Sequence, residues 1–181
     1  VEEGLQEGEE IVVEGTFSVD AAAQLANKPS MMNYTPPSPG LTLVAGELSG
    51  AQKQLLQPLF AQYFKLKDAL VGDDLDTAKK DFEKLAADWH KTDWKQMPEE
   101  IGKVFMEAGQ EPFLDRTKIS KTGRIDPLRN ELFYDLSNFF IRIAQYYGPF
   151  GQTIYVQHCP MANKDKGADW LSLEKEVLNP Y

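Results

Sequence analysis

The sequence of 181 residues has a single cysteine, two histidines and no long apolar run. One cysteine excludes an intrachain disulfide. No stretch of about 18 apolar residues occurs, so we expect no segment that spans a membrane. Basic residues are also few, with 19 Lys and Arg against 28 Asp and Glu and a net charge of −9. A negative field of this size repels phosphate backbones, so nucleic acid is not expected as a partner.

Several sequence signatures of enzymes and cofactor proteins are also missing. There is no Gly-rich phosphate loop, no zinc-finger spacing and no serine-nucleophile elbow. No paired carboxylates stand out, and the acidic residues spread over the surfaces of expected helices, which is typical of a solvated face. The sequence therefore predicts a protein that is not an enzyme and that requires no cofactor.

The composition, with 42% hydrophobic and 26% charged residues, is typical of a globular protein. We divide the chain into an N-terminal piece (1–34), a Pro-rich linker (35–48) and a helical domain with a hairpin (49–181). Within the first piece, 11–17 has the β-branched composition of a strand, and 18–27 is expected to form a short helix. The first ten residues lack a basic and an apolar region, so they do not resemble a signal peptide.

Four segments between 49 and 148 have apolar residues at helical spacing and suitable end signals. Ser49 and Gln52 form a capping-box pattern at the start of the first helix, and Gly72 ends it. The others are expected at 74–91, from Pro98 onward with a split at Pro112 and a continuation through 114–120, and from Asp126 to Gly148. Four amphipathic helices with short connections favour an antiparallel four-helix bundle.

The C-terminal part has the pattern of a β-hairpin. Residues 152–158 alternate and are β-branched, 163–167 contain turn formers, and 168–173 are suitable for a return strand. A short helical turn is expected at 173–178. The predicted fold class is therefore mainly α: an antiparallel four-helix bundle with a C-terminal β-hairpin, preceded by a short strand–helix segment and a linker.

The stretch YVQHCPM at 155–161 is the candidate site. It offers an imidazole (His158), a thiol (Cys159) and a thioether (Met161). Soft sulfur ligands favour Cu(I) and, by the same logic, Ag(I), and imidazole also suits copper and zinc. Pro160 removes a backbone donor and is expected to end the strand or to cause a bulge, after which Cys159 and Met161 could converge on one ion.

Strand alternation limits this site. His158 and Cys159 should point to opposite faces, which argues against a catalytic Cys–His pair and against three shared ligands without a backbone rearrangement. A lone cysteine among apolar residues is also commonly a small core hydrophobe, so packing is the open alternative. Met31 and Met32 add two thioethers in the Pro-rich part of the chain.

Residues 155–181 resemble the C-terminal signature of a bacterial helical domain: an aromatic-rich strand, Cys-Pro-Met-Ala, a Gly, Trp-Leu-Ser and Asn-Pro-Tyr. Residues 63–74 and 129–140 resemble the first and last helices of that domain. Such domains occur alone in secreted proteins or attached to the C-terminal end of heavy-metal efflux adaptors.

Residues 4–25 resemble the closing strand and short helix of the membrane-proximal domain in CusB-type periplasmic adaptors. The likeness rests on Gly-Leu-x-x-Gly followed by a valine-rich strand, Gly, Phe and Asp. Such adaptors are membrane fusion proteins that link a resistance–nodulation–division pump to an outer-membrane channel.

Together the two resemblances imply a periplasmic fragment of a copper or silver efflux adaptor. Pump and channel would be partners through the full-length adaptor, and self-association is a further expectation. Cys159 and Met161 match the Cys-Pro-Met positions and would hold Cu(I) or Ag(I) as cargo, with His158 as a third ligand. The resembling pattern continues into a segment with another Met and Cys, which would lie beyond Tyr181. The alternative is an assembly or protein-contact domain of the same adaptor that binds no metal.

Overall fold

The computed structural model describes residue 43 and residues 46–181. The strand and helix expected within 1–34, and most of the linker expected at 35–48, lie outside the described residues. All described residues belong to one compact unit, Ser38–Tyr181. Leu43 and Leu48 are buried in its core, so the end of the expected linker packs against the helices.

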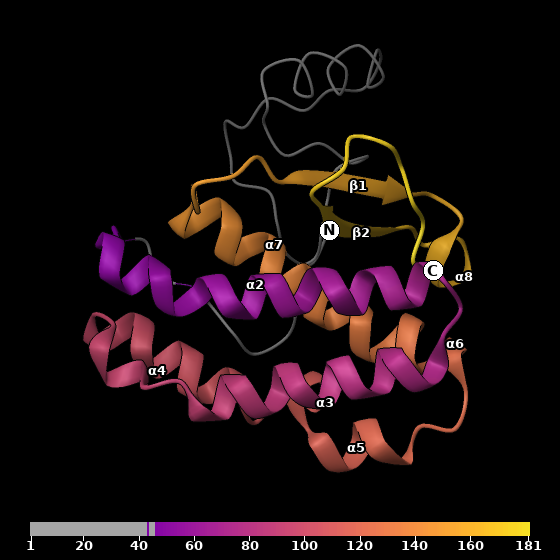
Figure 1. The fold of residues 1–181 in the computed structure, drawn as a ribbon, viewed down its shortest axis with the longest axis horizontal. Coiled ribbons are helices and arrows are strands. Elements are labelled where there is room, and N and C mark those ends of the chain that lie inside the picture. Colours follow the sequence, from indigo (N-terminus) through magenta and orange to yellow (C-terminus); the bar gives the residue numbers. More distant parts are fainter. Residues whose placement is uncertain (1–42, 44–45) are drawn as a thin grey trace, which may run out of the picture. The chain divides into compact units, whose positions relative to one another are not determined.

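The two longest helices, α2 (Gly50–Val71) and α3 (Leu75–Lys91), lie side by side and antiparallel (Figure 1). Ser49 begins α2 with the expected capping box. Its hydroxyl accepts from the backbone N–H of Gln52, and the Gln52 side chain accepts from the Ser49 N–H at 2.9 Å. Asp74 caps α3 in the same way by accepting from the N–H of Thr77.

The third expected helical segment is divided into shorter helices. The helix that begins after Pro98 is α4 (Glu99–Ala108), and it is separated from α5 (Arg116–Lys121) by the region of Pro112, where a split is expected. Two 3₁₀ turns, Trp94–Gln96 and Pro112–Leu114, connect these elements.

The last long helical segment changes its geometry along its length. It begins as α6 (Ile125–Pro127), passes through a π-helical stretch at Leu128–Phe133 and continues as α7 (Tyr134–Tyr147). Gly148 ends it, as predicted. A π-helical stretch inserts an extra residue per turn and has no simple sequence signal.

Aromatic side chains from four helices make the centre of the core. Trp89 of α3 lies 5.6 Å from both Phe105 of α4 and Phe139 of α7, measured between ring centroids. Tyr63 of α2 stacks on Phe140 of α7 at 4.9 Å. All five rings are at most 1% exposed, so the apolar stripes of the sequence form a packed core.

The prediction of a mainly helical fold with a C-terminal two-stranded antiparallel hairpin is confirmed. The finer arrangement as an antiparallel four-helix bundle stays a prediction. In the described part of the chain, no helix combines the length and the apolar composition that crossing a bilayer requires.

Candidate functional site

The hairpin consists of β1 (Tyr155–Cys159) and β2 (Ala168–Ser172), which pair antiparallel with His158 opposite Asp169 (Figure 1). A single helical turn, α8 (Ala162–Asp165), connects the strands. The N–H of Gly167 closes this turn by donating to the carbonyl of Ala162 at 3.0 Å. The prediction of a helical turn at 173–178 is wrong, because these residues form bends followed by irregular chain.

Strand β2 is anchored in the helical core. Trp170, Leu171 and Ser172 are completely buried. The Tyr63 hydroxyl of α2 accepts from the Leu171 N–H at 3.1 Å and shares a hydrogen bond of 2.8 Å with Ser137 of α7. Burial raises the pKa of Tyr63 well above its usual value, so the hydroxyl keeps its proton and remains available for these bonds.

Gln157 connects β1, β2 and the tail, which we define as residues 173–181. Its side-chain amide donates to the carbonyls of Glu174 and Glu176 at 2.9 and 2.7 Å. Its amide oxygen accepts from the indole N–H of Trp170 at 3.0 Å. Because Gln157 is 5% exposed and both its amide hydrogens and its oxygen have partners, it fixes the tail across the hairpin.

A buried lysine binds the start of the tail to α2. Lys67 is 1% exposed, and its Nζ lies 2.5 Å from Asp68 and 3.2 Å from Glu174. Ser172 donates to the same Glu174 carboxylate at 2.8 Å. The hydrogen bond from Ser172 lowers the pKa of the Glu174 carboxylate below its usual range, and the hydrogen bond from Lys67 lowers it further to a smaller extent. The paired ammonium thus holds the chain immediately after β2.

The end of the tail also packs into the domain. The Tyr181 ring lies 5.6 Å from the Phe133 ring and 5.9 Å from the Trp170 ring. Burial raises the pKa of the Tyr181 hydroxyl well above its usual value. The Asn-Pro-Tyr end of the sequence is therefore a structural element that covers one face of the hairpin.

The three predicted ligands have different surroundings. Cys159 is partly buried against the core, and its Sγ accepts from the Asn179 side-chain amide at 3.3 Å. Met161 precedes α8 and is 77% exposed. The side chain of His158 is 56% exposed, and its Nδ1 lies 2.7 Å from Asp169 Oδ1.

His158 and Cys159 therefore bond to different residues, as the alternation of β1 predicts. Among the described residues, no three His, Cys, Asp or Glu side chains gather where they could hold a metal ion. A soft-metal site in this region would need the thioether of Met161. The structure leaves this sulfur open to solvent, next to the proline that ends the strand.

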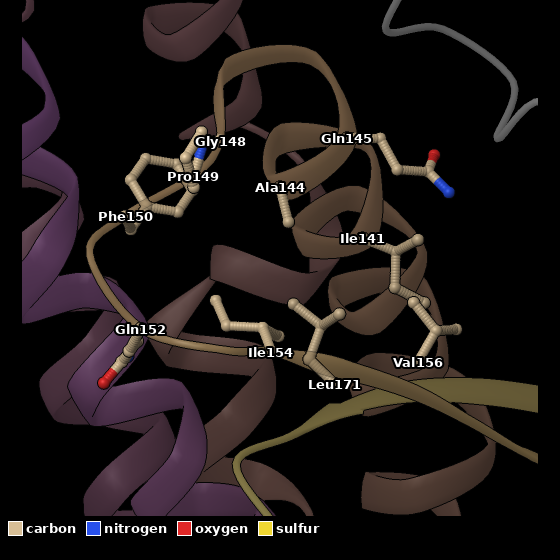
Figure 2. A pocket seen from close by; sticks show the side chains of 10 residues that line it. All are labelled: Ile141, Ala144, Gln145, Gly148, Pro149, Phe150, Gln152, Ile154, Val156 and Leu171. Atoms are coloured by element: carbon tan, nitrogen blue, oxygen red, sulfur yellow. The ribbon is translucent and has the colours of Figure 1, made fainter.

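An apolar cavity of about 290 Å³ lies between the second half of α7 and the approach to β1. Ile141, Ile154 and Leu171 surround it together with Val156, which is 54% exposed (Figure 2). No charged residue lines it. The sequence pattern did not indicate this cavity, because its walls come from three separate segments.

A family model matches residues 59–152, just over half of the chain. The chain belongs to the DUF3347 family. The family is described as a protein of unknown function. The matched residues run from within α2 to just before β1, so the hairpin with Cys159 and Met161 follows the match. No curated protein and no solved structure matches the chain.

Sequence analysis did not predict the contacts that support the hairpin, which involve Gln157, Asp169, Lys67 and Asn179. Only Asp169 could have been found, because a hairpin with known strand register places it opposite His158. The contact of Lys67 joins residues 107 positions apart, which no local pattern reveals.

Proposed function

We propose that this DUF3347 protein is part of a periplasmic heavy-metal efflux adaptor, and that its hairpin binds or hands over a soft ion, Cu(I) or Ag(I). The exposed thioether of Met161, two positions after Cys159, carries the proposal. Soft thioether and thiolate ligands select Cu(I) over harder ions. The resemblance of residues 4–25 and 155–181 to efflux adaptors supports the same function.

The exposure of Met161 suits a site that transfers its ion. A long apolar side chain that is 77% exposed contributes little to packing, so Met161 is free to meet an incoming ion. Cys159 lies at the edge of the core, and its sulfur has a single amide hydrogen bond that an ion could replace. In this proposal, Met161 makes the first contact and Cys159 strengthens the binding.

The helical part serves as the support of this site. Tyr63, Lys67 and Gln157 hold the hairpin and the tail through hydrogen bonds, and so support the segment that carries the ligands. We propose that the four longer helices form an antiparallel bundle, and that this bundle supports the hairpin. A resistance–nodulation–division pump and an outer-membrane channel are the proposed partners through the full-length adaptor, in the periplasm, with self-association of the adaptor.

The second candidate function is protein contact without metal binding. The uncharged cavity beside Val156 favours it, since an apolar depression next to an exposed strand residue suits a partner's side chain. In that case Cys159 would only pack, as its contact with the core allows.

Titration with Cu(I) against a competing chelator distinguishes these functions. We expect the full chain to bind one Cu(I), and both Cys159→Ser and Met161→Leu to weaken binding by about tenfold or more, or at least 1.4 kcal/mol. Met106→Leu is the matched control, because Met106 is 47% exposed on α4, outside the hairpin, and should not change the affinity.

Met31 and Met32 lie outside the described residues, so the series is repeated with both replaced by leucine to remove their thioethers. Thermal unfolding of each variant verifies the fold. Equal affinity in wild type and Cys159→Ser would remove Cys159 from the site. If the wild type binds no Cu(I), the protein-contact function is favoured instead.

A further inference from the structure

The imidazole of His158 is held from the opposite strand. His158 and Asp169 face each other in the register of the hairpin, and Nδ1 lies 2.7 Å from the Asp169 carboxylate. An ionised carboxylate can only accept hydrogen bonds. The proton of a neutral imidazole is therefore on Nδ1, and Nε2 keeps its lone pair.

The backbone at Gly167 lies close to the His158 imidazole ring and restricts its position from a second side. Its φ of +79° favours glycine, and a Cβ at this position would lie 2.9 Å from His158 Cε1 and 3.4 Å from Nε2. The ring thus lies close to the backbone of the turn, where a larger residue would have to displace it. More than half of the His158 side chain still remains exposed.

His158 lies near the end of β1, and Met161 lies in the connection that follows it, directly before α8. The ring rests on Gly167, and the Gly167 N–H bonds to the carbonyl of Ala162, the residue directly after Met161. One exposed nitrogen ligand and one exposed sulfur ligand are thereby supported by the same few residues.

We propose that Asp169 is a positioning residue for His158, which presents Nε2 as the nitrogen ligand of the ion that Met161 captures. A carboxylate bound to the other ring nitrogen is a common arrangement for metal-binding histidines, where it fixes the tautomer and makes the ligand more basic. This inference rests on the proposed function. It pairs His158 and Asp169 with the Met161 thioether, because Cys159 points to the opposite face of β1.

A cross-strand His–Asp pair could also serve only to stabilise the hairpin. That role predicts the same change of the ring tautomer, because it depends on the same hydrogen bond, but no effect on ion affinity once folding is preserved. The test therefore needs a readout from the metal-free ring and a second readout from the ion.

The experiment compares the full-length wild type with Asp169→Ala, Asp169→Glu and Asp126→Ala. Asp126 is the matched control, because it is an exposed aspartate that pairs with Arg124 and its loss changes the net charge equally. Long-range ¹⁵N–¹H correlations of the imidazole report the His158 tautomer without metal, and Cu(I) competition titration reports the affinity. Thermal unfolding verifies that each variant is folded.

We expect wild type and Asp126→Ala to show a proton on Nδ1 and equal affinity. Asp169→Ala should shift the proton toward Nε2 and weaken Cu(I) binding by about 10- to 100-fold, with partial recovery in Asp169→Glu. An unchanged tautomer, or an affinity equal to that of Asp126→Ala, would overturn the inference. If the tautomer follows Asp169 but the wild type binds no Cu(I), the proposed function fails and the ligand role of His158 fails with it.

Discussion

Replacement of Trp170 by alanine is expected to lower the free energy of unfolding by about 3–5 kcal/mol. Trp170 is fully buried, contacts the Tyr181 ring and donates its indole N–H to Gln157. The substitution opens a cavity and leaves the Gln157 oxygen without this donor. Since Gln157 also binds the tail through Glu174 and Glu176, the tail should loosen as well.

Urea unfolding measures this loss, and hydrogen exchange of residues 173–181 reports the tail. Trp170→Phe is the control, because it keeps most of the ring volume and should lose clearly less stability than Trp170→Ala. A loss below about 1 kcal/mol for Trp170→Ala would mean that the hairpin contributes little to the fold.

Replacement of Gly102 by alanine should destabilise the protein by about 1–3 kcal/mol, which is the usual cost of overpacking. Alanine normally stabilises a helix interior relative to glycine by roughly 0.5–1 kcal/mol. Here, however, the added Cβ would lie 2.6 Å from the backbone oxygen of Trp94. Because that oxygen belongs to the main chain, α4 or the turn at Trp94–Gln96 must move.

Gly50→Ala is the matched control, since a Cβ on Gly50 meets nothing within 4 Å at the start of α2. We expect it to be neutral or slightly stabilising in the same urea unfolding measurement. Stability of Gly102→Ala equal to or above that of Gly50→Ala would contradict the close approach of α4 to Trp94.

The sequence was most informative where the determinants of structure are local. The Ser49–Gln52 capping box and Gly72 defined α2, and Asp74 defined the start of α3. Contacts between distant residues could not be predicted. The π-helical stretch at Leu128–Phe133 has no local signal, and the approach of Gly102 to Trp94 depends on how α4 packs.

The surroundings of the candidate residues were predictable in part for the same reason. Alternation along one strand separates His158 from Cys159, and their different hydrogen-bond partners agree with it. The partners themselves come from β2 and the tail, so they depend on the register of the hairpin and on the course of residues 173–181. The exposure of Met161 likewise follows from the helical turn α8, where the sequence indicated only a turn.

The central claim is that the hairpin binds a soft ion through sulfur. X-ray absorption of the full chain loaded with one equivalent of Cu(I) tests it most directly, because it identifies the atoms bound to the metal. We expect sulfur neighbours at about 2.3 Å and a nitrogen neighbour at about 2.0 Å, by analogy with zinc sites, with loss of sulfur signal in Met161→Leu and none in Met106→Leu. A spectrum with only nitrogen and oxygen neighbours, or one that Met161→Leu leaves unchanged, would contradict the claim.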